Sequence, residues 1–176
     1  LILARSLSLK GALVITGPTA SGKSQLTLDL AKHLGAEIIS ADSAQVYRGM
    51  NIGSAKPDAA ALSEIKHHLI DIRDPADPYS AAEFRKDCIV LVSRIQREGK
   101  LAIISGGTML YLKGLKEGLA ELPAADLGVR AEISRRAEER GWQDLHQELA
   151  RVDLESSKRI KATDPQRLQR ALEVFR

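Results

Sequence analysis

A glycine-rich stretch between a predicted strand and a predicted helix constrains the fold more than any other feature of the sequence. It fits the pattern G-x-x-x-x-G-K-[ST] and consists of Gly17, Pro18, Thr19, Ala20, Ser21, Gly22, Lys23 and Ser24. The apolar run 12–16 predicts a buried strand, and leucines at spacing four in 25–34 predict a helix that ends at Gly35. Inward-turned amides at the positive end of this helix favour phosphate. We therefore expect a di- or triphosphate site, with Lys23 adding positive charge and Ser24 placed to bind Mg²⁺.

Strand and helix signals alternate along the first part of the chain. Further buried strands are predicted at residues 37–41, 68–72 and 101–105. Ser80 and Glu83 form a capping-box pattern for a helix that runs to about Glu98 and is closed by Gly99. The alternation predicts an α/β fold over residues 11–122, namely a P-loop NTPase-like parallel sheet flanked by helices, with ligands at the carboxyl ends of the strands.

The pattern changes near Leu122-Pro123, after which only helical signals appear. These signals predict an all-helical insertion over residues 123–164, with helices at 126–141, 142–150 and 154–160. A capping residue followed by proline, Asp164-Pro165, starts a last helix, and we assign residues 165–176 to the start of a helix that returns to the core. This helix has no stop signal before Arg176, so we expect the chain to be cut short here.

Composition excludes several other classes of protein. Hydrophobic residues make up 44% of the 176 residues and charged residues 28%, which argues against disorder. The single cysteine, Cys88, excludes an intrachain disulfide, and an aromatic content of 3% argues against a base-stacking platform. No apolar run approaches the roughly 20 residues of a membrane span, and the mildly basic residues 1–10 lead into a strand rather than resembling a signal peptide. We expect a cytoplasmic monomer without a membrane partner, whose net charge of +3 permits an anionic partner.

Two positions at strand ends each have two interpretations. Asp42 is the acid at a strand end near the phosphate loop, and it could act as a general base or simply cap a turn. The segment Gly106-Gly107-Thr108 could let the backbone approach a ligand, or Thr108 could cap the helix that follows. The strand 101–105 ends without the acid that supports the metal in P-loop NTPases, so the use of the phosphate loop stays open at this point.

An ordered series of motifs carries a family resemblance. The motifs occupy residues 17–24, 40–47, 50–57, 67–71, 79–81 with Phe84, 106–111 and 164–173. The series is similar to that of the bacterial tRNA dimethylallyltransferases, also called tRNA isopentenyltransferases, and the resemblance runs from about Ala12 to Arg176.

The resemblance implies transfer of a dimethylallyl group from dimethylallyl diphosphate to N6 of adenosine 37 in tRNA, with release of diphosphate. Thr19 to Ser24 would cradle the diphosphate, with Lys23 neutralising the leaving group and Ser24 holding Mg²⁺. Asp42 would accept the proton from the adenine amino group, and Thr108 would act beside it and Lys23 as the third catalytic residue.

The family's contacts with the tRNA anticodon stem-loop also carry over by position. They fall on Asp42, Ser43, Ala44, Gln45, Thr108, Arg130, Gln166, Arg167, Leu168, Gln169 and Arg170, and the Gln45 side chain is given no role of its own. The helical insertion would then grip the stem-loop. Between residues 158 and 176 basic residues outnumber acidic ones, which suits an RNA backbone but is also typical of a solvated helix face.

Two other functions compete with this one. A P-loop small-molecule or nucleoside kinase would use ATP with Asp42 as base, and a non-catalytic RNA-binding domain would keep a vestigial nucleotide site. The helical segment after Pro123 is too long for the simple lid of a kinase. RNA binding alone leaves the phosphate loop and Asp42 unexplained, so we favour the prenyltransferase.

Overall fold

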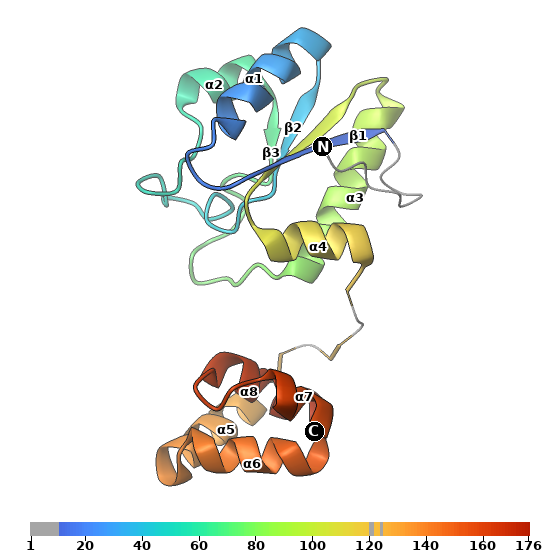
Figure 1. Ribbon diagram of the computed structural model, residues 1–176. Helices are drawn as coiled ribbons and strands as arrows, with labels where there is room; N and C mark the ends of the chain where they lie inside the picture. The colour runs from blue at the N-terminus through green and yellow to red at the C-terminus, as the bar shows by residue number, and fades with distance from the viewer. Residues whose placement is uncertain (1–10, 120–121, 124) are drawn as a thin grey trace. The chain divides into compact units, whose positions relative to one another are not determined.

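The chain divides into two compact units, of which the first ends at Leu119 and the second continues to Arg176 (Figure 1). The computed structural model describes residues 11–119, 122, 123 and 125–176, and the predicted lead-in at residues 1–10 lies outside this description. The predicted domain boundary at 122/123 lies three residues from the observed division. Each unit has its own hydrophobic core.

A four-stranded parallel sheet forms the centre of the first unit, within the described residues. Its order is β1-β4-β2-β3, with bounds β1 Ala12–Thr16, β2 Glu37–Ser40, β3 His67–His68 and β4 Ala102–Gly106. In register, Ile104 of β4 lies beside Val14 of β1 on one side and Ile39 of β2 on the other. Because neighbouring strands are parallel, the segments that follow β1, β2 and β4 leave the sheet at one edge.

Helices cover both faces of this sheet, as the alternating signals predict (Figure 1). They are α1 Lys23–Leu34, α2 Ala59–Glu64, α3 Ala81–Arg97 and α4 Met109–Glu117. Successive side chains of a strand point to opposite faces, so Ile38 and Ile103 pack in the cluster that contains Ala31 of α1. Their neighbours Ile39 and Ile104 pack in the other cluster, which contains residues of α3 and α4.

Local signals give correct helix ends, but one strand prediction is wrong. Ser80 and Glu83 form the predicted capping box at the start of α3. The predicted strand 68–72 stops at His68, because Leu69 and Asp71 have φ angles of 62° and 55°. Backbone in this left-handed region cannot continue an extended strand. The short helix α2 was not predicted.

The second unit is helical throughout its regular structure, as the sequence predicts. Its helices are α5 Leu127–Arg140, α6 Trp142–Val152, α7 Leu154–Arg159 and α8 Pro165–Phe175. Ile133 of α5, Leu145 of α6 and Leu168 of α8 are fully buried in one cluster. The described part of α8 therefore packs into the helical unit, where the sequence assigned it to a return toward the core. None of the described helices has the length and apolar character needed to cross a membrane.

A buried carboxylate ties α8 to the start of α5. The side chain of Glu173 is 3% exposed, and it accepts hydrogen bonds from Arg130 Nε at 3.0 Å and Arg170 Nη1 at 2.7 Å. The backbone N–H of Asp126 donates to the same carboxylate at 2.7 Å. Burial alone would raise the pKa of Glu173, but these hydrogen bonds lower it to about 2. The charged form of this group therefore stabilises the helical unit.

We expect Glu173→Gln to lower the free energy of unfolding of the helical unit by about 2 kcal/mol at pH 7, because two guanidinium groups lose their charged acceptor. The stabilisation is complete above the ordinary pKa of 4.5 and is lost as pH falls through the folded pKa of about 2. Thermal denaturation at pH 7 and pH 3 measures the effect, which should be smaller at pH 3. The control Glu139→Gln removes an exposed partner of Arg135 and should change little. An equal loss at both pH values would contradict the assignment.

Candidate active site

The phosphate loop follows β1 and turns directly into α1. Ala20 and Gly22 adopt left-handed φ angles of 62° and 79°, and Gly22 is the residue that precedes the first turn of the helix. Lys23 Nζ donates a hydrogen bond to the carbonyl oxygen of Pro18 at 3.0 Å, so its ammonium group lies on the loop. The loop thus presents a helix N-terminus and a cation at one place, which is the arrangement that anions bind.

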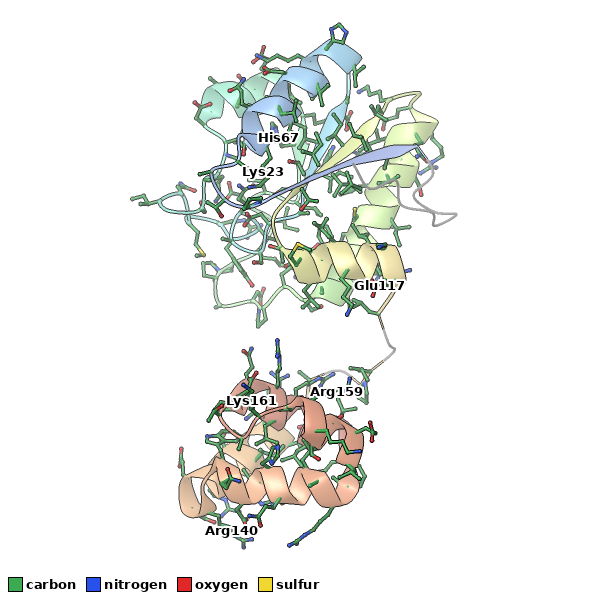
Figure 2. The ribbon with its side chains drawn as sticks, in the orientation of Figure 1. Lys23, His67, Glu117, Arg140, Arg159 and Lys161 are labelled. Carbon is green, nitrogen blue, oxygen red and sulfur yellow. The ribbon has the colours of Figure 1, made fainter. Side chains whose placement is uncertain are left out.

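A pocket of about 240 Å³ lies against this loop. Lys23 and Ser24 line it together with Asp42, which follows β2. Figure 2 labels Lys23 of α1 and His67 of β3, two residues that line the pocket. The sequence predicted the meeting of Asp42 with the loop, because parallel strands end at the same edge. It did not predict the part of the lining that comes from Gly53, Ser54, Ala55, Pro57 and His67.

The structure confirms the turn-capping interpretation of Asp42, while its role as a general base stays a prediction. Its Oδ1 atom accepts hydrogen bonds from the N–H groups of Ala44 at 2.8 Å and Gln45 at 3.3 Å, which is the turn-capping role. The same side chain lines the pocket beside Lys23 and Ser24. Since one oxygen orients the carboxylate, the other can face a ligand without loss of the turn.

Thr108 lies at the N-cap position of α4, and its hydroxyl holds the loop after β2. Its Oγ1 accepts a hydrogen bond from Ser43 N–H at 2.9 Å and lies 3.2 Å from Ser43 Oγ, whereas it makes no capping hydrogen bond to α4. Thr108 N–H donates to the carbonyl oxygen of Ala41 at 3.2 Å. Thr108 is thus the N-cap residue of α4, as the capping interpretation expects, but its side chain bonds to the neighbouring loop and not to the helix. Its hydroxyl positions the turn that holds Asp42.

A hydroxyl pair that the sequence analysis missed joins α1 to β4. Thr27 Oγ1 and Ser105 Oγ lie 2.8 Å apart, and the Thr27 hydroxyl also donates to the carbonyl oxygen of Lys23 at 2.7 Å. Both residues line the pocket. A serine inside the otherwise apolar strand run was the available signal, and the pair fastens the first turn of α1 to the sheet.

The structure separates the predicted RNA contacts into exposed and internal groups. The guanidinium groups of Arg130 and Arg170 bind Glu173, and Leu168 is buried in the core of the helical unit. Gln169 Nε2 donates to the carbonyl oxygen of Arg130 and to Ser134 Oγ. The side chains of Gln166 and Arg167 are exposed. They line a second, open pocket with Arg159, Lys161, Thr163, Asp164 and Pro165.

The residues near the phosphate loop fit a magnesium ion that takes most of its ligands from phosphate. Among the described residues, no three His, Cys, Asp or Glu side chains gather into a metal site. The exposed Ser24 hydroxyl makes no hydrogen bond within the described part of the chain, so it can supply one oxygen. Mg²⁺ is commonly bound by one or two protein oxygens together with phosphate oxygens and water. The Ser24 hydroxyl could be the protein oxygen in such a coordination shell.

A parallel sheet with a phosphate loop and a carboxylate at its edge defines a protein of the P-loop fold class. The sequence model of the IPP transferase family matches residues 45–176, and the chain belongs to this family. It is 57% identical over 164 residues to a tRNA dimethylallyltransferase of Nitrosospira multiformis, covering 93% of this chain and 51% of that protein. The chain thus spans about half the length of the curated relatives it matches.

Solved structures agree with this family. A tRNA isopentenylpyrophosphate transferase from Bacillus halodurans matches with a TM-score of 0.61 and 40% identity, over 94% of this chain and 55% of that one. A eukaryotic dimethylallyltransferase acting on tRNA matches with a TM-score of 0.73 and 29% identity, over 93% of this chain and 41% of that one. The P-loop NTPase-like fold predicted from the sequence is confirmed.

We expect Gly106→Ala to destabilise the first unit by about 2 kcal/mol, because overpacking against backbone cannot be relieved cheaply. A Cβ atom at Gly106 would lie 2.2 Å from the carbonyl oxygen of Ala41. Gly107→Ala is the matched control, since its Cβ atom would lie an ordinary 3.6 Å from Gly17 O. Urea denaturation of both variants measures the difference. Equal stability of the two variants would mean that β2 and β4 can separate at this edge without cost.

Proposed function

We propose that the protein containing this chain transfers a dimethylallyl group from dimethylallyl diphosphate to N6 of adenosine 37 in tRNA and releases diphosphate. The observation that carries the proposal is the shared pocket of Lys23, Ser24 and Asp42. One side of that pocket suits a diphosphate, and the carboxylate suits an amine that must lose a proton. The names of the relatives supply the substrate class.

The donor's diphosphate would lie on Thr19 to Ser24. Backbone N–H groups of the loop and the ammonium of Lys23 face the oxygens on which negative charge develops as the carbon–oxygen bond breaks. Ser24 would hold Mg²⁺, which when bound supplies further neutralisation of the leaving diphosphate. Because the diphosphate departs intact, no phosphoryl group is transferred, and the strand that ends at Gly106 needs no metal-supporting acid.

The acceptor's amino group would approach Asp42. An exocyclic adenine amine is a poor nucleophile, so it needs a base and a fixed position. Asp42 would accept the proton as the new carbon–nitrogen bond forms, while Thr108 keeps the Asp42 turn in place through Ser43. The adenine has to leave the stack of the anticodon loop to reach this carboxylate, at a cost of a few kcal/mol.

The tRNA phosphates would bind the open pocket of the helical unit. Arg159, Lys161 and Arg167 line it, against the one acid Asp164 in its lining. Arg167 is 76% exposed and, among the described residues, pairs only with Asp164 at 3.5 Å, so the guanidinium can exchange that partner for phosphate. We place this reaction in the cytoplasm, with the protein acting as a monomer.

Transfer is tested with the full-length protein, labelled dimethylallyl diphosphate and unmodified tRNA. We expect label in the tRNA and release of diphosphate, and no transfer from labelled ATP in the parallel control. Transfer of phosphate from ATP would replace this proposal with the kinase.

The variant Asp42→Asn tests the role of Asp42 as the base, because the amide oxygen can still accept hydrogen bonds from the two N–H groups of the turn. The variant should keep its melting temperature and lose transfer at least about 10²-fold; near-normal turnover would remove Asp42 from the chemistry.

The RNA surface is tested by the salt dependence of tRNA binding. We expect Arg167→Gln and Lys161→Gln each to weaken binding and to reduce the slope of log K against log salt by about one phosphate contact. Arg140→Gln is the control, because Arg140 lies on the side of the helical unit away from Lys161 (Figure 2). Fluorescence titration from low to moderate salt gives the slopes. Slopes equal to that of the control would mean that Arg167 and Lys161 do not contact the tRNA phosphates.

A further inference from the structure

Part of the lining of the active-site pocket comes from residues 50–57, a segment without helix or strand that we call the wall segment. Gly53, Ser54, Ala55 and Pro57 of this segment line the pocket, as does Leu28 of α1. Two of its residues have left-handed backbone, Gly53 with φ 78° and Ala55 with φ 50°. A non-glycine residue keeps such a conformation only where its surroundings enforce it. Other side chains must therefore hold the wall segment in place.

The side chain of Gln45 supplies the first of these constraints. Its Oε1 accepts a hydrogen bond from Ser40 Oγ at 2.8 Å, which anchors it to the end of β2. Its Nε2 donates to the carbonyl oxygens of Ser54 at 3.2 Å and Ala55 at 3.0 Å. Gln45 thus spans from the sheet to the left-handed turn of the wall segment.

Lys56 supplies the second constraint from within the wall segment. Its side chain is 5% exposed, and its ammonium donates to the carbonyl oxygen of Tyr47 at 2.9 Å, Asn51 Oδ1 at 3.0 Å and Asp71 Oδ1 at 2.6 Å. Asp71 is held in turn, because its N–H donates to the carbonyl oxygen of Gln45 at 3.1 Å. The three N–H donors of the buried cation are all used, so the wall segment brings no free positive charge to the pocket.

We infer that Gln45, Lys56 and Asp71 are positioning residues that fix the wall segment against the uncharged, organic part of the donor. The inference rests on the proposed function. The phosphate loop would provide the cation and amides for diphosphate, whereas the wall segment adds Ala55 and Pro57 to a lining that also contains the apolar Leu28 and Ile38. The interaction of Lys56 with Asp71 also gives a physical role to the motifs 50–57 and 67–71, which the chemistry of transfer leaves unused.

The test compares two ligands that share a diphosphate and differ in the organic group. Dissociation constants for dimethylallyl diphosphate and for inorganic diphosphate are measured by calorimetry on full-length Gln45→Ala and Lys56→Met. We expect about tenfold weaker binding of dimethylallyl diphosphate with less than a twofold change for inorganic diphosphate. Steady-state kinetics of Lys56→Met, which changes a residue outside the expected tRNA contacts, should show a raised donor KM with an unchanged tRNA KM. Lys32→Met is the control, because it removes a lysine whose partner Glu64 lies on the surface.

Two results would overturn the inference. Unchanged binding of dimethylallyl diphosphate would mean that the wall segment does not contact the donor, and equal weakening of both ligands would mean general damage to the site. Should Lys56→Met not fold, Gln45→Ala decides by the same criterion. Failure of the proposed function looks different, because the parent protein itself would then transfer no prenyl group.

Discussion

Where β2 and β4 end, their backbones lie so close that the carbonyl oxygen of Ala41 would meet any side chain placed at Gly106. This approach lets Ala41 N–H donate to Ser105 O and lets Thr108 N–H donate back to Ala41 O. The two strand ends are thereby joined as one piece, and the turn that carries Asp42 is held against the phosphate loop. The proximity of Asp42 to the phosphate loop thus depends on backbone contact at a glycine, before any charged group takes part.

The sequence predicted most of the fold because its signals were local. The capping box at Ser80 and the glycines that end helices act within a few residues, and the structure places those ends as expected. The strand at 68–72 failed because its apolar pattern was that of a strand while Leu69 and Asp71 turn the backbone. Such a turn is fixed by tertiary contacts such as the one between Asp71 and Lys56, which residue order does not reveal.

The candidate site was predictable only where topology alone decides. Parallel strands bring Asp42 beside Lys23, so that meeting followed from the strand pattern. The hydrogen bond from Ser43 to Thr108 joins residues far apart in the chain, and no local signal announces it. The number of basic residues also does not show which arginines are exposed. Arg130 and Arg170 bind a buried carboxylate, whereas Arg167 faces solvent, and the sequence presents all three only as arginines in predicted helices.

The contact of Lys23 with the carbonyl oxygen of Pro18 has a consequence for ligand entry. A flexible lysine normally loses much rotational freedom when it is captured by an anion. Here the ammonium already lies on the loop, so an arriving anion would replace one oxygen acceptor by another. The Lys23 side chain has already lost much of its rotational freedom during folding, so capture of an anion would need little further rearrangement of the protein.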